Sequence, residues 1–212
     1  DIRVKRDVIN IPTITTKKLD GGVFVIQLMT FSAQSSSLFR NALREFIESG
    51  DTKLILDLRG NPGGYLESAV DMASWFLPTG KVVVTEDYAG HAQNIVHRSR
   101  GYNIFNDNLK IVILVNKGSA SASEILAGAL RHYGKAKLVG VPTFGKGSVQ
   151  ELVDITSETS IKITIARWLG PDGNQIPISG IIPDVEVKVS DEDAKADKDP
   201  QLDKAVEMIN SI

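Results

Sequence analysis

The feature that most constrains the fold is a repeated order of short apolar strand, small-residue turn and amphipathic helix. The apolar run Leu54–Leu58 meets the glycine-rich turn Arg59–Gly64, and the run Lys110–Val115 meets a turn rich in serine and alanine. Strands that alternate with helices are typical of parallel sheets covered by helices. Such open sheets place their functional sites at the carboxyl ends of the strands. The sequence therefore predicts an α/β fold, with both turns on the functional face.

The remaining elements follow from hydrophobic periodicity and turn residues. Three serines at 35–37 can cap a helix, and strands dominate after Val149. Helices are expected at Leu38–Glu48, Leu66–Leu77, Ser121–Arg131 and Leu202–Ile209. Further strands are expected at Ile2–Val8, Val23–Met29, Lys81–Thr85, Lys137–Gly140, Gln150–Ile155, Ser160–Trp168 and Asp184–Val189, with a polar irregular stretch at 87–108. We divide the chain into a strand segment (1–20), a core (21–190) and an acidic, solvated linker with a terminal helix (191–212).

Composition narrows the classes of function. The chain has 212 residues, 42% of them hydrophobic, and a formal net charge of −2, so no basic surface favours nucleic acid. No apolar run approaches the roughly 18 residues that a membrane span needs. With no cysteine and three scattered histidines, we expect no disulfide, metal site or cofactor. The first ten residues lack the apolar stretch of a signal peptide, and a start at Asp1 suggests a processed chain.

Three serines alternate with alanine in the turn after Val115, at Ser119, Ser121 and Ser123. Ser121 and Glu124 have the spacing of a capping box, and small residues also pack closely. Three hydroxyls on one turn are nevertheless more than a cap requires. They lie where the start of a helix leaves backbone N–H groups unpaired. The residues alone leave a capping role and a catalytic role open.

Lys146 stands between Gly145 and Gly147 in an otherwise apolar segment. It is either a surface lysine on a turn or a lysine whose burial favours the neutral amine, which can accept a proton. In the second case the amide of Gln150, four residues on, could hold the amine in place. A Ser–Lys pair needs neither histidine nor carboxylate, which suits a chain with few histidines.

The turn Asp57–Gly64 also has two interpretations. It is a tight connection between strand and helix that needs glycine for positive φ. Alternatively, it aims a backbone donor at a developing oxyanion, together with the N–H of Ala122. Asp57 and Arg59 can form a structural ion pair in either case.

Four segments together resemble the tail-specific, or C-terminal processing, proteases. They are LILDLRGNPGG (Leu54–Gly64), NKGSASASEILAGAL (Asn116–Leu130), VGVPTFGKGSVQ (Val139–Gln150) and GIIPDVEV (Gly180–Val187). Their order and spacing match, and the resemblance covers most of the chain, as far as QLDKAVE at 201–207.

The resemblance implies a serine endopeptidase that cleaves proteins or peptides near apolar C-terminal tails through an acyl-enzyme. The residues implied as nucleophile, base, orienting residue and oxyanion donors are Ser121, Lys146, Gln150, and Ala122 with Gly63 or Gly64. The implied fold is the ββα superhelix shared with crotonases and caseinolytic protease subunits, with additional C-terminal β-strands. The implied location is the bacterial envelope, periplasmic or otherwise extracytoplasmic, and the oligomeric state stays open.

The chain departs from the family pattern in two places. Members usually carry a peptide-binding PDZ domain just before the segment that begins here at Asp1. None is visible, so the chain is either a trimmed core or a relative without that domain. The position eleven residues after Ser121 is commonly Asp in the family, and His132 stands there.

Three competing functions deserve comparison with a Ser–Lys peptidase. Gly140–Lys146 fits the start of a phosphate-binding loop, but Gly147 replaces the required Ser or Thr and a strand is expected where a helix must begin. A non-catalytic relative that only binds peptide tails would not need Ser121, Lys146 and Gln150 intact. A crotonase-type enzyme acting on acyl-CoA shares the fold but would not need a Ser–Lys pair.

Overall fold

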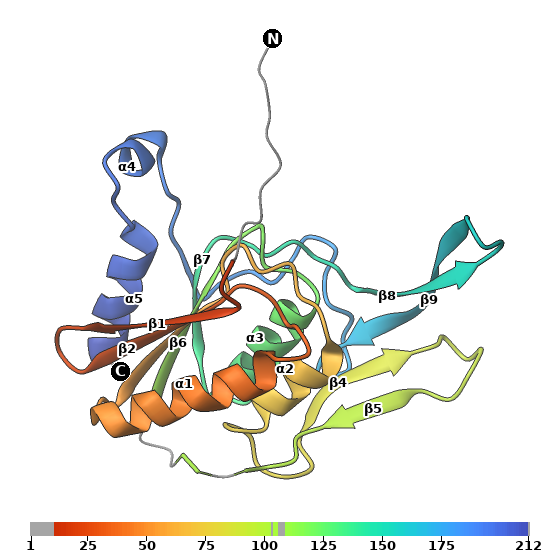
Figure 1. Cartoon of the computed structure of the whole chain (residues 1–212), viewed down its shortest axis with the longest axis horizontal. Coiled ribbons are helices and arrows are strands. Elements are labelled where there is room, and N and C mark those ends of the chain that lie inside the picture. The colour runs from red at the N-terminus through yellow and green to blue at the C-terminus, as the bar shows by residue number, and fades with distance from the viewer. Residues whose placement is uncertain (1–10, 103, 106–108, 212) are drawn as a thin grey trace.

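The computed structural model describes residues 11–102, 104–105 and 109–211 (Figure 1). The strand expected at 2–8 lies outside the described residues. The elements in chain order are β1 (Ile14–Leu19), β2 (Val23–Leu28), α1 (Ser35–Ser49), β3 (Lys53–Asp57), α2 (Leu66–Ala73), β4 (Val82–Asp87), β5 (Ile95–Arg98), β6 (Lys110–Val115), α3 (Ala122–His132), β7 (Lys137–Gly140), β8 (Ser148–Asp154), β9 (Ser160–Leu169), β10 (Val185–Glu186), α4 (Asp191–Lys195) and α5 (Pro200–Ser211).

The main sheet has six strands in the order β1-β2-β3-β6-β7-β10. β1 is antiparallel to β2, and every other neighbouring pair is parallel. β3 and β6 are adjacent, so the turns that follow them leave the same edge of the sheet. This arrangement confirms the predicted α/β class and brings the two motif-bearing turns together.

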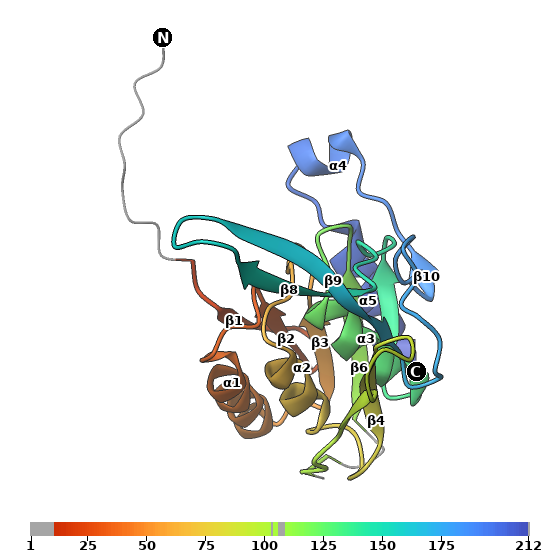
Figure 2. The ribbon, with the colours of Figure 1, turned by 90° about the vertical axis from the view of Figure 1, so that its right-hand side faces the viewer.

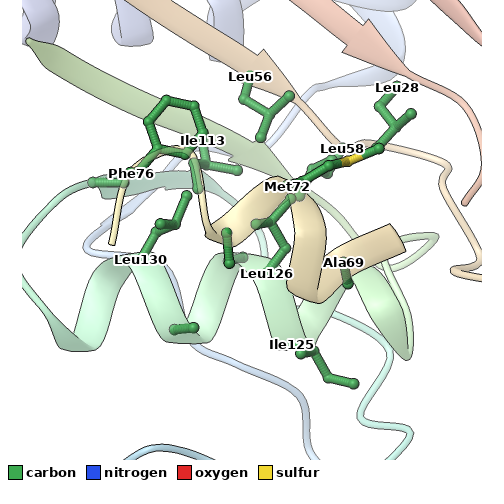
Figure 3. Close-up of a cluster of buried hydrophobic side chains, with 14 of the residues drawn as sticks. Leu28, Leu56, Leu58, Ala69, Met72, Phe76, Ile113, Ile125, Leu126 and Leu130 are labelled. Atoms are coloured by element: carbon green, nitrogen blue, oxygen red, sulfur yellow. The ribbon is translucent and has the colours of Figure 1, made fainter. Parts of the chain in front are cut away.

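Helices cover both faces of the main sheet. The apolar sides of α1, α2 and α3 pack with Leu28, Leu56 and Ile113 into the larger core cluster. Figure 3 shows the part of this cluster that lies at α2 and α3. On the opposite face, Ala205 and Ile209 of α5 pack against Val25, Ile55 and the other residues that β2, β3, β6 and β7 direct there. Because β3 and β6 are covered on both sides, their sequences are continuous apolar runs rather than alternations of apolar and polar residues.

A second sheet of four antiparallel strands has the order β5-β4-β9-β8. Its outer hairpin, β8–β9, projects from the body of the molecule (Figure 1). The last five residues of β8 and the first five of β9, which form the outer part of the hairpin, are exposed. These are the additional strands expected after the parallel core, and β8 begins two residues after Lys146.

The structure corrects several expected elements. β1 and β5 are strands that the sequence did not indicate, and β5 lies within the stretch 87–108 expected to be irregular. α1 begins at Ser35 itself, with Gln34 as its N-cap. The segment expected to be a solvated linker contains α4. Ser190 caps the start of this helix, because its hydroxyl accepts a hydrogen bond from the N–H of Asp193. α4 stands clear of the sheets in both views (Figures 1 and 2).

Candidate active site

The turn between β6 and α3 gives its three serines different surroundings. Ser119 is buried, and its hydroxyl donates to the Leu58 carbonyl at 2.8 Å. Ser123 is also buried, and its hydroxyl donates to the Asn61 carbonyl at 2.9 Å. Ser121 is half-buried and has φ +55° and ψ −115°, a conformation that is strained for any residue but glycine and that concentrates at functional sites. The outer serines therefore fasten the turn, and the strain singles out Ser121.

Gly63 packs directly against this turn. It has φ +99°, and a Cβ added to it would lie 2.8 Å from Cβ of Ser121 and 2.7 Å from the carbonyl oxygen of Ala120. Real Cβ atoms do not approach other atoms so closely, so a side chain here would push the two turns apart. Glycine is required at this position both for the positive φ and for the close approach.

The backbone N–H groups near Ser121 differ in their availability. The N–H of Gly63 donates to Oδ1 of Asn61 at 2.9 Å. Among the described residues, neither the N–H of Gly64 nor that of Ala122 has a hydrogen-bond acceptor. N–H groups without an acceptor, one of them at the start of a helix, are available to a negatively charged oxygen. Of the two glycines that the sequence offered, the geometry favours Gly64 as the donor.

Asn61 joins both turns to the end of β2, a role that the sequence did not reveal. It is fully buried, and its amide nitrogen donates to the Leu28 carbonyl at 2.8 Å. Its own carbonyl accepts hydrogen bonds from Ala120 N–H at 3.1 Å and from the Ser123 hydroxyl. Since its side-chain oxygen also holds Gly63, Asn61 sets the position of the glycine turn relative to Ser121.

The base segment, which we define as residues 143–147, runs beside the serine turn. Lys146 is half-buried, and its neighbours Gly145 and Gly147 are buried. The Phe144 N–H donates to the Ser119 carbonyl at 2.9 Å, which links the two segments directly. A Cβ on Gly145 would collide with the Ile178 carbonyl. The segment is therefore held between the serine turn and the turn that contains Ile178.

A buried carboxylate, that of Glu124 in the first turn of α3, binds the serine turn to the base segment. Its Oε2 accepts hydrogen bonds from the N–H of Ser121 at 2.8 Å and from the N–H of Lys146 at 3.0 Å. Its Oε1 accepts from the hydroxyl of Thr143 at 2.6 Å and from the N–H of Gly145 at 2.7 Å. Four donors satisfy a fully buried carboxylate, which would otherwise be costly. Glu124 thus fixes the backbones of Ser121 and Lys146 relative to each other.

The other expected site residues lie farther from this centre. Gln150 is exposed on β8, and no hydrogen bond joins its side chain to Lys146 in the described part of the chain. Its orienting role stays a prediction. His132 ends α3, eleven residues after Ser121, which at 1.5 Å per residue is about 16 Å along the helix. Its ring contacts Tyr133 instead, so His132 is not placed to serve Ser121.

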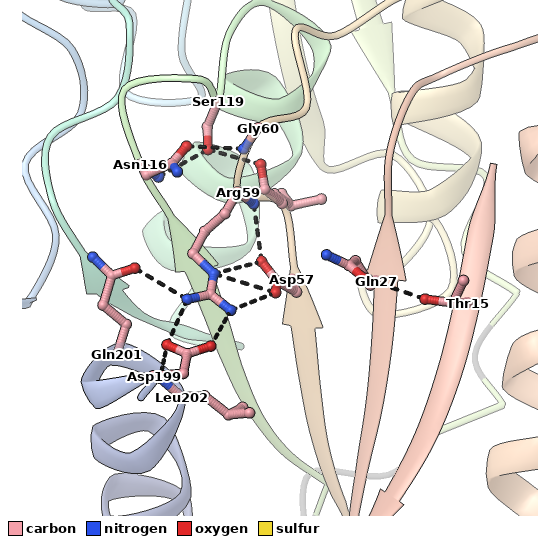
Figure 4. Close-up of polar contacts among 11 residues, drawn as sticks. Thr15, Gln27, Asp57, Arg59, Gly60, Asn116, Ser119, Asp199, Gln201 and Leu202 are labelled. Carbon is pink, nitrogen blue, oxygen red and sulfur yellow. Dashed lines mark hydrogen bonds and ion pairs between the residues drawn. The ribbon is translucent and has the colours of Figure 1, made fainter. Parts of the chain in front are cut away.

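Arg59 ties the glycine turn to the C-terminal segment (Figure 4). Its guanidinium pairs with Asp57 at 2.8 Å and with both carboxylate oxygens of Asp199 at 2.7 and 2.8 Å. Burial lowers the pKa of Arg59, but its hydrogen bonds to Asp199 and Asp57 outweigh this and raise it. For Asp199, burial acts to raise the pKa, but hydrogen bonds from Arg59 and from the Leu202 N–H outweigh burial and hold the pKa below its ordinary value. The expected ion pair between Asp57 and Arg59 is present. The sequence did not indicate that Asp199 also binds Arg59.

The phosphate-binding alternative receives no support from the geometry. A phosphate-binding loop at Gly140–Lys146 would have to lead into a helix, but β8 follows instead. Residues 11–102, 104–105 and 109–211 contain no cluster of three or more His, Cys, Asp or Glu side chains that could hold a metal ion. Over the same residues, each helix is too short or too polar to cross a membrane.

The α/β core thus places a strained serine at a helix start beside a glycine turn and a lysine-bearing segment. The family model described as peptidase family S41 matches residues 22–187. The chain belongs to this family, and the resemblance to C-terminal processing proteases is confirmed.

Individual relatives agree with this assignment. The chain is 39% identical over 187 residues to a protein of Staphylococcus epidermidis named "Probable CtpA-like serine protease", covering 88% of this chain and 38% of that protein. A protein of the same name from Staphylococcus aureus is 41% identical over 193 residues, with 88% and 37% covered. The photosystem II D1 C-terminal processing protease superposes with a TM-score of 0.74 at 30% identity, covering 85% of this chain and 49% of that one. The chain thus spans less than half the length of these relatives.

Proposed function

We propose that this chain is the catalytic portion of a serine endopeptidase that uses a Ser121–Lys146 dyad. The observation that carries the proposal is the shared carboxylate of Glu124, which binds the backbone N–H groups of both residues. Family membership supports peptide hydrolysis, and the strained backbone of Ser121 supports its role as the nucleophile.

In the proposed reaction, Oγ of Ser121 adds to the carbonyl carbon of the scissile peptide bond while its proton moves to the neutral amine of Lys146. The carbonyl oxygen becomes an oxyanion that accepts hydrogen bonds from the N–H groups of Gly64 and Ala122. One such donor typically stabilises the transition state by about 3 kcal/mol.

The tetrahedral adduct then expels the amine of the downstream peptide, which takes the proton from Lys146. A water molecule gives its proton to Lys146 and adds to the acyl-enzyme, and collapse of this second adduct returns the proton to Ser121. Gln150 would orient the lysine amine once a substrate orders the site. Gly63 contributes by allowing the glycine turn to approach Ser121.

The wider assignment is also a proposal. The name of the D1 protease describes processing at a C-terminus, and we infer that substrates of this chain are proteins or peptides cleaved near apolar C-terminal tails. We further propose that it works in the bacterial envelope. Fractionation of the source cells with an antibody against the chain would test the location.

The function is tested by incubating the protein with an unfolded protein such as casein, in the presence of a metal chelator and without nucleotide. A fluorophosphonate probe, which reacts with activated serines, gives a second readout. Cleavage and labelling should both disappear in Ser121→Ala and Lys146→Ala. Binding of peptide tails without any cleavage or labelling would identify a non-catalytic relative instead.

A further inference from the structure

Phe144 is exposed although this chain hides its other phenylalanines. Its side chain is 63% exposed, whereas five of the other six are buried and Phe105 is half-buried. A single exposed apolar residue needs no explanation, but a cluster of them marks a binding surface. The exposure of its neighbours therefore decides whether Phe144 belongs to such a cluster.

Two further large apolar side chains are exposed around the same centre. Ile178 is 83% exposed, and its carbonyl lies against Gly145, the residue after Phe144. Tyr65 is 58% exposed and directly follows Gly64 in the glycine turn. We call Tyr65, Phe144 and Ile178 the apolar rim. Its members come from three separate segments: Tyr65 directly follows Gly64, Phe144 lies two residues before Lys146, and Ile178 approaches Gly145 through its carbonyl.

The backbone of the rim is firmly held while its side chains are left in solvent. The Phe144 N–H donates to the Ser119 carbonyl at 2.9 Å, and the Tyr65 N–H donates to the Phe31 carbonyl at 2.7 Å. On either side of Phe144, the hydroxyl of Thr143 and the N–H of Gly145 are bound by Glu124. An ordered backbone that presents an exposed aromatic side chain is the arrangement of a preformed binding anchor rather than of a loosely packed loop.

We propose that the apolar rim binds a large apolar side chain of the substrate peptide close to the scissile bond, with Phe144 as the main specificity determinant. This inference rests on the proposed peptidase function and adds the chemistry that the site selects. The occupant is an extended peptide segment, because Tyr65 directly follows Gly64 and the N–H of Phe144 binds the serine turn that leads to Ala122. The N–H groups of Gly64 and Ala122 would hold the carbonyl of that segment. Transfer of one large apolar side chain from water to such a surface changes affinity on the order of tenfold or more.

The test compares the variants Phe144→Ala, Phe144→Leu and Ile155→Ala. Ile155 is a matched control, since it is 64% exposed but lies at the end of the projecting β8–β9 hairpin. Each variant is assayed with two peptides that differ only near the cleaved bond, one with leucine and one with serine, and with p-nitrophenyl acetate, which is too small to reach the rim.

In Phe144→Ala, kcat/KM for the leucine peptide should fall at least tenfold, mainly through KM, and its advantage over the serine peptide should shrink. Phe144→Leu should restore most of the preference, and Ile155→Ala should match the parent. Turnover of the ester should match the parent in Ile155→Ala, and in the two Phe144 variants it should fall no more than turnover of the serine peptide. Equal losses for both peptides and the ester would overturn the proposal, since Phe144 would then support the catalytic segment itself. So would an unchanged preference in Phe144→Ala. If the parent cleaves neither peptide nor ester, the peptidase function fails and the rim has no substrate to select.

Discussion

The backbone N–H of Lys146 donates a hydrogen bond to the carboxylate of Glu124 at 3.0 Å, across 22 residues of chain. The same oxygen receives the N–H of Ser121 at 2.8 Å. The register between the helix that begins after Ser121 and the segment that carries Lys146 therefore depends on one buried side chain. A change of that side chain should affect catalysis without touching either proposed catalytic group.

Glu124→Gln should lose most of its peptidase activity and unfold at a lower urea concentration. Each carboxylate oxygen of Glu124 accepts two hydrogen bonds. In glutamine an NH₂ group replaces one of these oxygens and cannot accept them. Leaving the buried donors unpaired costs about 1–3 kcal/mol. Urea unfolding followed by circular dichroism gives the stability, and the casein assay gives the activity. Glu48→Gln, on the exposed side of α1, is the control and should match the parent. Parental activity in Glu124→Gln would show that the carboxylate does not set the geometry of the site.

Removal of the proposed nucleophile should separate function from stability. Ser121→Ala and Ser121→Gly should both be inactive, but Ser121→Gly should be the more stable of the two. The reason is the positive φ of residue 121, which costs an alanine on the order of 1 kcal/mol and a glycine nothing comparable. Thermal unfolding checks the order of stability. An alanine variant that is as stable as the glycine variant would mean that the backbone at 121 is not strained.

Two glycines of the same turn provide a matched pair. Gly63→Ala should abolish activity, because the new Cβ would lie 2.8 Å from Cβ of Ser121. Gly60 has a similar positive φ, of +70°, but a Cβ there would meet nothing within 4 Å. Gly60→Ala should therefore be destabilised only by backbone strain, about 1 kcal/mol, and remain active. Steady-state kinetics of the two variants distinguish the steric clash with Ser121 from backbone strain. Equal losses of activity in both variants would point to strain alone.

The sequence predicts the parallel core because its signals are local. Leu54–Leu58 and Lys110–Val115 are buried on both faces, so each reads as an apolar run without reference to the rest of the chain. β1 was not located for the opposite reason, since most of its residues are exposed on an outer strand and its place in the sheet depends on pairing with β2.

The same difference between local and long-range signals applies to the site. Ser121 and Lys146 stand in recognisable motifs, whereas the role of Glu124 depends on N–H groups 21 and 22 residues away. Its capping-box spacing with Ser121 suggested only a local role. Asn61 is hidden similarly, because its partner Leu28 belongs to another strand. The sequence carries no local signal for either of these long-range partners.

Substitution of the proposed base should distinguish proton transfer from simple positive charge. Lys146→Arg should be nearly as inactive as Lys146→Ala, because a guanidinium stays protonated in proteins and cannot accept a proton from serine. Loss of more than about a hundredfold in kcat is expected, the lower range for a general base. Binding of a non-cleavable peptide to both variants, measured by fluorescence anisotropy, controls for folding. Substantial turnover by the arginine variant would contradict the dyad.

The link between Asp199 and Arg59 should make part of the stability depend on pH. Hydrogen bonds from Arg59 and the Leu202 N–H outweigh burial and hold the pKa of Asp199 below its ordinary value of 3.8. Because the folded pKa is lower, the unfolded chain takes up the proton first as the pH falls. The stabilisation is therefore present above about pH 4 and is lost as the pH drops through the folded pKa.

Asp199→Asn should consequently lower the free energy of unfolding at pH 7, by about 1 kcal/mol or less because the carboxylate is 37% exposed and screened by water. The difference between parent and variant should shrink towards zero as the pH falls through the folded pKa of Asp199, because the parent carboxyl is then also protonated. Urea unfolding at pH 7 and at a series of lower pH values measures it, and Asp20→Asn, an exposed turn residue, is the control. A difference that persists unchanged in acid would mean that Asp199 stabilises α5 through its hydrogen bond from the Leu202 N–H rather than through its charge.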